Sequence, residues 1–424
     1  MKWGSLNADR TRLLASLAFN FIAKVPGIAA VFFVLPLISR TLGTATYGEL
    51  LSALALGSVC NLPFGGINAV GRRLLAAEVG ARDTTKQANV FVTTTTLMFA
   101  AALAVSIVMV LGSARSWTSP VFIFVSLLPI LSGFFNVFDN IRASYNEHYV
   151  TALFQLFFQV AVFGSVLLFG LPAAGVVLAG LSLQSPAILA SISTLVVLVI
   201  AKPFLLSGRI EGARAMLIPI FGIMVADGAL AALLNLSVYW LNVSAHADMA
   251  AWVGTFVRLF QSFMSPVLLI LFPVTSYISI RWNSMASARQ QLLHKLFIVA
   301  GLLYGCIVGG AMAIAGPAYI GHMFKLSSRG DWIDVLALSV FMGAVIAQKA
   351  YTMLIYAVSE ARFISYGTAA LAATGVLMAA VAGRWLSAMG MLDVLFLFMG
   401  VTLPALLLVG DRYIRRSNIS AIIN

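Results

Sequence analysis

The stretch LLASLAFNFIAKVPGIAAVFFVLPLI, residues 13–38, decides the fold class of this chain. At about 1.5 Å per residue, a helix of this length crosses the ~30 Å hydrocarbon core of a bilayer. A secretory signal peptide is the alternative, but its apolar region covers only about 7–15 residues and ends at a small-residue cleavage site. This run is longer and no such site closes it convincingly. It is therefore predicted to be an uncleaved first membrane span.

Comparable apolar runs follow along the whole chain. Of its 424 residues, 61% are hydrophobic and 9% are charged, whereas a soluble chain is about half apolar and about a quarter charged. Backbone groups in lipid must be satisfied within the segment, which favours helices, and the alternating pattern of a β-barrel does not occur. We predict an all-α membrane protein with twelve transmembrane helices. They are expected at residues 13–38, 49–70, 88–111, 119–140, 149–170, 173–200, 215–240, 249–279, 292–316, 333–358, 363–383 and 391–410.

The loops between these spans are short and leave no room for a further folded domain. The inner loop at 201–214 separates the first six spans from the last six, and its proline and glycines suit a linker. We predict an N-terminal six-helix bundle at residues 1–205 and a C-terminal six-helix bundle at 206–424. Many transporters consist of two such repeats with the substrate site at their interface.

The basic residues predict the orientation of the spans. With the N-terminus in the cytoplasm, eighteen of the 26 Lys and Arg residues lie on the inner side, five on the outer side and three within spans. Cytoplasmic loops of membrane proteins carry such an excess. Both termini are therefore predicted to be cytoplasmic. The same distribution explains most of the net charge of +12 without nucleic acid as a partner.

Sequence motifs for catalysis and metal binding are absent. There is no Walker-type loop, no zinc-protease motif and no nucleophile elbow. Cys60 and Cys306 lie in apolar runs and are too few for a disulfide framework or a zinc site. We expect no cofactor, no metal and no catalytic residue. Gly301, Gly305 and Gly309, spaced by four, are predicted to form a helix-packing face.

Four charged residues lie well inside predicted spans: Lys24, Arg258, Lys349 and Asp227. A charge at the centre of a span costs at least ~2.5–3.5 kcal/mol, so such residues face a partner, the bundle interior or a wet cavity. Asp139, near a span end, is expected to be interfacial. Three cations against one clear central acid predict a cavity that accepts a negatively charged substrate.

Polar neighbours support this cavity. Asn20 lies one turn before Lys24 on the same helical face, and Gln261 lies one turn after Arg258. We expect both to line the cavity beside the cations. Asp227 has two alternative roles, as an ion-pair partner of Arg258 or as a residue that carries a coupling ion.

The stretch LPLISRTLGTATYGELLSALAL, residues 35–56, carries Arg40, Leu42-Gly43 and Tyr47-Gly48. It resembles the entry to the second helix of the Wzx-type flippases, which export O-antigen and exopolysaccharide units. These proteins share the MOP superfamily with the MATE drug exporters and the lipid II flippases, which usually carry two more spans. The second half is similar to the opening of that family's second half in the following residues: Asp227, Trp252, Arg258, Leu259, Pro266 and Pro273.

The resemblance implies a V-shaped, MATE-like pair of six-helix bundles around a central cavity. It implies alternating access that moves an undecaprenyl-diphosphate-linked oligosaccharide across a bacterial inner membrane for cell-surface polysaccharide biosynthesis. Lys24, Arg258 and Lys349 would then bind the pyrophosphate or acidic sugars. The expected partners are this lipid-linked substrate, membrane lipids and the polysaccharide polymerase or export machinery.

Two other functions remain open at this point. A MATE-type antiporter of small molecules or ions would need a mainly acidic cavity for cationic drugs. A membrane-embedded polysaccharide polymerase or ligase would need a sizeable outer loop, whereas the longest one, 317–332, has about sixteen residues. The sequence favours the flippase, which is not an enzyme, over both.

Overall fold

The computed structural model describes residues 3–115, 119–145, 147–170, 175–244, 246–282, 285–326, 331–358 and 362–423. Some side chains within these ranges, including those of Asn20 and Asp227, lie outside the described part. Every described element is helical. The elements are α1 (Trp3–Leu42), α2 (Thr44–Cys60), α3 (Leu62–Ala81), α4 (Thr84–Arg115), α5 (Pro120–Ser144), α6 (His148–Phe169), α7 (Gly175–Ala201), η1 (Pro203–Ser207), α8 (Ala213–Val243), α9 (Ala247–Arg281), α10 (Ser287–Tyr319), η3 (Ile320–Phe324), α11 (Trp332–Val358), α12 (Arg362–Ala382) and α13 (Ala388–Ile423).

These helices confirm the predicted all-α membrane class. Over the described residues, nine helices are long and apolar enough to cross a membrane, and two bent helix pairs raise the number to as many as eleven. The bent pairs are α2 with α3, at 44°, and the two parts of α8, residues 213–225 and 228–243, at 47°. The remaining predicted span, 249–279, coincides with α9. The count of twelve membrane crossings stays a prediction.

The predicted span at 49–70 is not one straight helix, because it breaks at Asn61 between α2 and α3. The side-chain amide of Asn61 donates a hydrogen bond to the carbonyl oxygen of Pro129 in α5, at 2.7 Å. Pro63 lies in the first turn of α3, where its missing N–H costs nothing. A helix start after Asn61 therefore replaces the continuous helix that hydropathy predicts.

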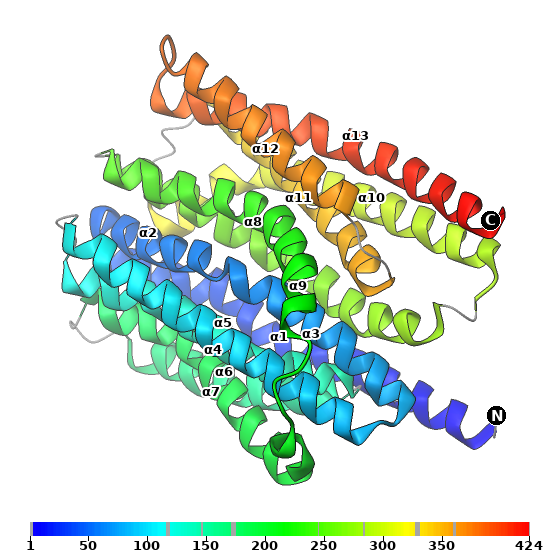
Figure 1. Ribbon diagram of the computed structural model, residues 1–424. Coiled ribbons are helices and arrows are strands. Elements are labelled where there is room, and N and C mark those ends of the chain that lie inside the picture. Colours follow the sequence, from blue (N-terminus) through cyan, green and yellow to red (C-terminus); the bar gives the residue numbers. More distant parts are fainter. Residues whose placement is uncertain are drawn as a thin grey trace.

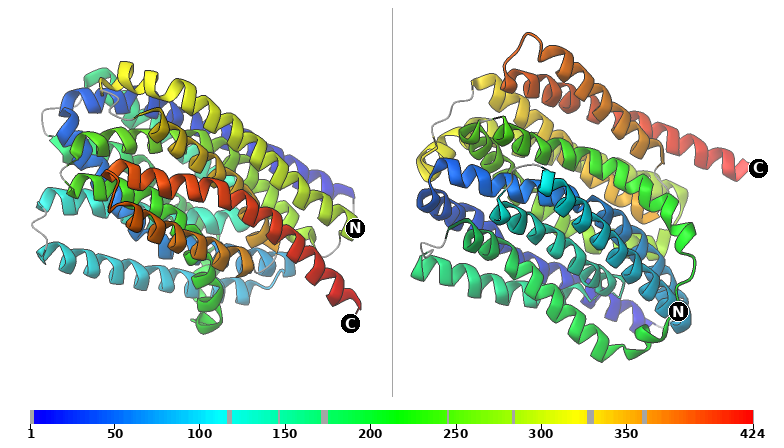
Figure 2. Two further views of the ribbon diagram at one scale, coloured as in Figure 1. Left: turned by 90° about the horizontal axis from the view of Figure 1, so that it is seen from above. Right: turned by 60° about the vertical axis from the view of Figure 1, so that its left-hand side comes forward.

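The helices run side by side in two groups (Figure 1). In the first half of the chain, α1 packs on α6, and α7 packs on α5 and α6. In the second half, α11 packs on α10 and α13, and α12 packs on α13. The start of α1 and the end of α13 lie at the same end of the molecule. Figure 2 shows α12 and α13 at one edge and α6 and α7 at the other, with α2, α3 and α8 between them.

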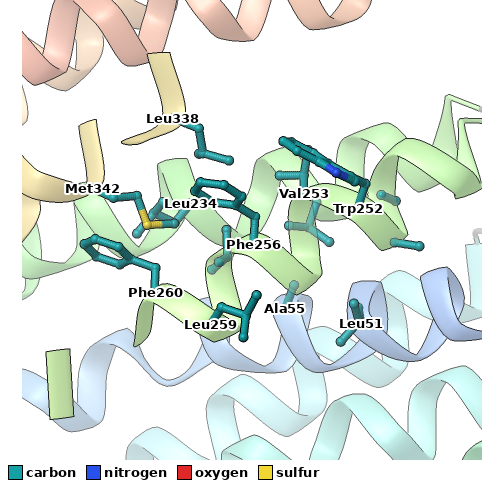
Figure 3. Packing of buried hydrophobic residues seen from close by; sticks show 14 of the residues in the cluster. Leu51, Ala55, Leu234, Trp252, Val253, Phe256, Leu259, Phe260, Leu338 and Met342 are labelled. Atoms are coloured by element: carbon teal, nitrogen blue, oxygen red, sulfur yellow. The ribbon is translucent and has the colours of Figure 1, made fainter. Parts of the chain in front are cut away.

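The two halves meet where α1, α2 and α3 pack on α8 and α9. Figure 3 shows Leu51 and Ala55 of α2 beside Phe256 and Leu259 of α9, in one apolar cluster with Met342 of α11. Because lipid is as apolar as these side chains, close packing rather than removal from water holds such helices together. The predicted division at residues 205 and 206 stays a prediction, since the apolar clusters run across it.

The glycine face of α10 packs on α11, as predicted. A Cβ added at Gly305 would meet the carbonyl oxygen of Gly343 well inside contact distance, and one at Gly343 would lie 2.7 Å from the carbonyl oxygen of Gly305. At Gly309 the added Cβ would lie 2.8 Å from the carbonyl oxygen of Ser339. The two backbones therefore touch directly, which is the usual role of small residues between membrane helices.

The segment that connects the halves is bound to α4. Asn89 donates to the carboxylate of Glu211 at 2.6 Å and accepts from the backbone N–H of Arg209 at 2.9 Å. Thr93 and the backbone of Glu211 exchange two further hydrogen bonds, at 3.1 and 2.9 Å. Gly208 lies so close to the α4 backbone that a Cβ would not fit. The chain leaves this contact at Gly212, whose φ of +69° precedes the start of α8.

Candidate functional site

Lys24 lies on α1, which packs on α6 in the first half, and its side chain is partly buried. Its ammonium group interacts with the carboxylate of Asp139, at a separation beyond the 4.0 Å of a direct ion pair. Asp139 is only 9% exposed. The Lys24 ammonium and the Asp139 carboxylate therefore lie near each other among apolar helices, where an isolated charge is costly.

Hydroxyl groups from two further helices surround Asp139. Ser191 of α7 donates a hydrogen bond to Asp139 Oδ2 at 2.7 Å. The hydroxyls of Thr194 in α7 and Thr151 in α6 lie near this carboxylate and 3.3 Å from each other, while Asp139 Oδ1 has no hydrogen-bond partner among the described residues. We call Lys24, Asp139, Thr151, Ser191 and Thr194 the Lys24–Asp139 cluster. It draws on α1, α5, α6 and α7, which the sequence shows as four separate apolar runs.

The expectation that Asp139 lies near the membrane interface stays a prediction, but its side chain is buried between helices and not exposed at a span end. The predicted span ends at residue 140, but α5 continues to Ser144, which places Asp139 inside the helix and between its neighbours. The hydroxyls of Ser191 and Thr194 lie on α7, one turn apart on one face. They are a weak signal in the sequence, because Ser and Thr also occur in membrane helices where they only join two helices.

A glutamine extends the polar region next to Lys24. Gly27 is one turn further along α1, and a Cβ added there would lie 3.2 Å from the amide nitrogen of Gln159 in α6. The amide oxygen of Gln159 is buried and accepts no hydrogen bond in the described part of the structure. A buried acceptor of this kind favours a bound water or a polar ligand beside it.

Arg258 occupies a different place, at the contact between the halves. It is partly buried in α9 and lies near the phenol of Tyr47 in α2. Thr255, one turn earlier on α9, donates to that phenol oxygen at 3.3 Å. Arg258 lies eleven residues after the start of α9, about 16 Å along the helix axis at the usual rise. Gln261 is partly buried on the next turn.

Lys349 lies on α11, inside the second half, and is partly buried. It is about 26 Å from the start of that helix. The adjacent residue Gln348 is fully buried, and neither its amide oxygen nor its amide nitrogen has a hydrogen-bond partner among the described residues. The three cations thus lie on three helices, one in each half and one between them. A single cavity shared by all three stays a prediction.

Two predicted site residues fall outside the described side chains. Asn20 lies on α1 and Asp227 lies on α8, but only their backbones are described. The predicted ion pair between Asp227 and Arg258 is therefore untested. In the described part of the chain, no group of three or more His, Cys, Asp and Glu residues could hold a metal ion.

An apolar groove of about 370 Å³ lies between α1 of the first half and α9 and α10 of the second. Ile307, on its rim, is 60% exposed, so the groove reaches the surface that faces lipid. Its size and character suit a hydrocarbon chain more than a polar solute. Its walls include Phe32 of α1, Leu259 and Phe263 of α9, and Tyr304, Met312 and Tyr319 of α10.

Comparison with known proteins gives structural matches alone. No protein-family model matches the sequence, and no curated protein matches it. A crystal structure of a MATE P26A mutant aligns with a TM-score of 0.67 and 15% identity, over 97% of this chain and 96% of that chain. An outward-facing multidrug resistance MATE transporter of the MOP superfamily aligns with a TM-score of 0.67 and 14% identity, over 97% and 96%. An inward-facing one aligns with a TM-score of 0.62 and 13% identity, over 96% and 98%.

These matches cover nearly all of each chain, so the correspondence is one of whole architecture. At 13–15% identity they report the fold alone. They include one transporter in the outward-facing state and one in the inward-facing state. The predicted MATE-like architecture is confirmed, while the Wzx-type subfamily stays a prediction. The chain has the fold of the MATE family transporters of the MOP superfamily.

Proposed function

We propose that this chain is a membrane transporter that works by alternating access between its two halves. The observation that carries the proposal is the MATE fold along nearly the whole chain. A second observation supports it: α6 and α7 pack mainly within the first half and α11 to α13 mainly within the second, while α1, α2 and α3 meet α8, α9 and η3 between the halves. Relative motion of the halves would change these contacts and leave the others intact.

The Lys24–Asp139 cluster is the part of the molecule best suited to couple transport to an ion. Titratable groups inside membrane helices commonly mark ion or proton pathways. Asp139 accepts a hydrogen bond from Ser191 at Oδ2, while its Oδ1 has no partner among the described residues and is free to take up a proton or a cation beside the hydroxyls of Thr151 and Thr194. Proton or cation binding at Asp139 would change the balance of charge with Lys24 and, through α1, the contact between the halves.

The first substrate candidate is a small molecule or ion exchanged across a bacterial inner membrane, with both termini in the cytoplasm. The structural neighbours support it, since one of them is described as a multidrug resistance MATE transporter. The buried carboxylate of Asp139 supports it as well, because Lys24 no longer stands as an uncompensated cation. The surplus of intramembrane cations predicted from the sequence is thereby reduced.

The second candidate is the undecaprenyl-diphosphate-linked oligosaccharide. The apolar groove favours it, because the groove lies between the halves and reaches the lipid-facing surface. Such a groove suits the hydrocarbon chain of an amphiphile, and a guanidinium such as that of Arg258 suits its anionic phosphate. The resemblance of residues 35–56 to Wzx-type flippases agrees with it. A polysaccharide polymerase would then be a partner.

One reconstitution experiment separates the two candidates. Purified protein in proteoliposomes is supplied with a fluorescent organic cation under an imposed pH gradient, and separately with a fluorescent lipid-diphosphate oligosaccharide. Gradient-driven movement of the dye supports small-molecule antiport. Movement of the lipid between leaflets supports the flippase. If neither substrate moves while the protein remains folded, the transporter proposal for these substrate classes fails.

Matched variants connect the result to residues. Asp139→Asn should abolish gradient-driven dye movement, and Arg258→Ala should reduce lipid flipping at least tenfold, the loss that removal of one charged hydrogen-bond partner produces. Arg289→Ala removes an exposed cation at the start of α10 and should leave both activities unchanged. Lys24→Ala and Lys349→Ala test the other predicted cations in the same assays.

A further inference from the structure

We propose that Arg40 holds the transporter closed at one end by capping the C-terminal end of α10 and η3 from the opposite half of the molecule. The proposal rests on the alternating-access function proposed above and adds the residue that controls one of its two states. The end concerned is the one that the distribution of basic residues predicts to be outer. Arg40 and Ser39 of α1, with Met323 and Phe324 of η3, are called the outer latch.

The hydrogen bonds of the outer latch cross between the halves. Arg40 Nε donates to the carbonyl oxygen of Met323 at 2.9 Å, and its Nη2 lies 3.5 Å from the carbonyl oxygen of His322. Ser39 Oγ donates to the carbonyl oxygen of Phe324 at 3.3 Å. The last carbonyls of η3 thus have side-chain partners that lie more than 280 residues earlier in the chain.

These carbonyls are the groups that a helix end leaves without an intrahelical partner. α10 and η3 form one continuous helical stretch of 38 residues, which ends where Lys325 adopts a left-handed φ of +55°. The aligned peptide dipoles give such an end a partial negative charge, which favours a cation. The planar guanidinium of Arg40 directs several N–H donors along fixed directions and so reaches two successive carbonyls at once.

Ring contacts around the latch join the same elements. The ring of Phe324 lies 6.3 Å from Tyr47 of α2 and 6.2 Å from Tyr319 of α10. The hydroxyl of Tyr319 donates to the carbonyl oxygen of Phe32 in α1 at 3.0 Å. α1 and α2 are therefore held to the end of α10 by polar and aromatic contacts together. All of them must break if the halves separate at this end.

Arg40 is the residue of the latch whose loss can be tested most directly. Its side chain is exposed, so truncation leaves no buried hole. The same exposure limits its contribution, since hydrogen bonds made in contact with water are weak in net terms. We expect Arg40→Ala to raise the ratio of open to closed molecules at this end about three- to tenfold.

Spin-label distance measurements report this ratio independently of transport. Labels are placed at Val121 on α5 and Trp385 in the turn before α13, both exposed and predicted to be outer, after Cys60 and Cys306 are replaced by serine. Arg40→Ala should increase the population at the longer distance. Arg40→Lys should fall between it and the parent protein, because an ammonium keeps the charge without the planar fork.

Arg384→Ala provides the matched control, since it removes another exposed arginine on the predicted outer side. It should leave the distances unchanged. The proposal is overturned if Arg40→Ala gives the parent distribution, or if Arg384→Ala shifts it equally. Should Arg40→Ala fail to fold, Ser39→Ala removes the contact to Phe324 and must shift the distances in the same direction. A distance shift in protein that transports nothing would retain the latch and refute the proposed function.

Discussion

Adding one methyl group at Gly48 should force the two halves apart at the start of α2. The Cβ of Gly48→Ala would lie 2.6 Å from the carbonyl oxygen of Ala247 and 3.3 Å from its carbonyl carbon, whereas ordinary contact begins at 3.4 Å. The first separation must therefore grow by about 0.8 Å, and both contacts are with backbone, which does not rotate away. Overpacking of this kind costs about 1–3 kcal/mol.

The control is Gly65→Ala on α3, where an added Cβ meets nothing within 4 Å. Both variants gain the same helix propensity, about 0.5–1 kcal/mol, so the difference between them isolates the contact. At about 2–4 °C for each kcal/mol, Gly48→Ala should melt about 2–12 °C below Gly65→Ala. Tryptophan fluorescence of the purified protein in detergent reports the melting. Equal melting temperatures would refute the close approach of α2 and α9.

Three further outcomes follow from described contacts. Ser191→Ala removes the donor at 2.7 Å from Asp139 and should lower the free energy of unfolding by about 1.5–3 kcal/mol, measured as loss of thermal stability against the parent protein. Gly343→Ala places a Cβ 2.7 Å from a backbone oxygen of α10 and should lower the melting temperature. Gly310→Ala, where an added Cβ meets nothing within 4 Å, should not. Similar melting temperatures of the two variants would contradict the close packing of α10 on α11. Asn89→Ala should speed hydrogen exchange of the backbone amides at 208–212, and unchanged exchange would show that the linker is held by other contacts.

The sequence predicts the membrane helices well because hydropathy follows directly from composition along the chain. Each predicted span coincides with a helix or with one of the bent pairs. The break at Asn61 escapes this reasoning, since it depends on a hydrogen bond to Pro129 in another helix. The glycine face of α10 was predictable, because small residues at a spacing of four usually allow two membrane helices to pack closely. Its partner helix was not.

The candidate site was predicted only in part, for a related reason. Lys24 stands out in the sequence because a charge in an apolar run is rare. Asp139 does not, because hydropathy places it near the end of a run and says nothing of how far the helix continues. Its importance comes from the packing of α5 on α7 and of α1 on α6, which brings Ser191 and Thr151 to it. The periodicity of one sequence shows which face of a helix is buried, but not which other helix packs on that face.

The attachment of the linker to α4 has a mechanical consequence. Because residues 208–211 are fixed to the first half, the connection to the second half has no slack, and its free part begins at Gly212. In the proposed alternating access, the second half would then tilt about this point and not slide away from the first half. α8 has 31 residues and is bent by 47°, so each degree of tilt would displace its far end by about 0.7 Å at the usual rise. The start of α8 would thus be the pivot, and the end of the molecule that carries Arg40 would move furthest.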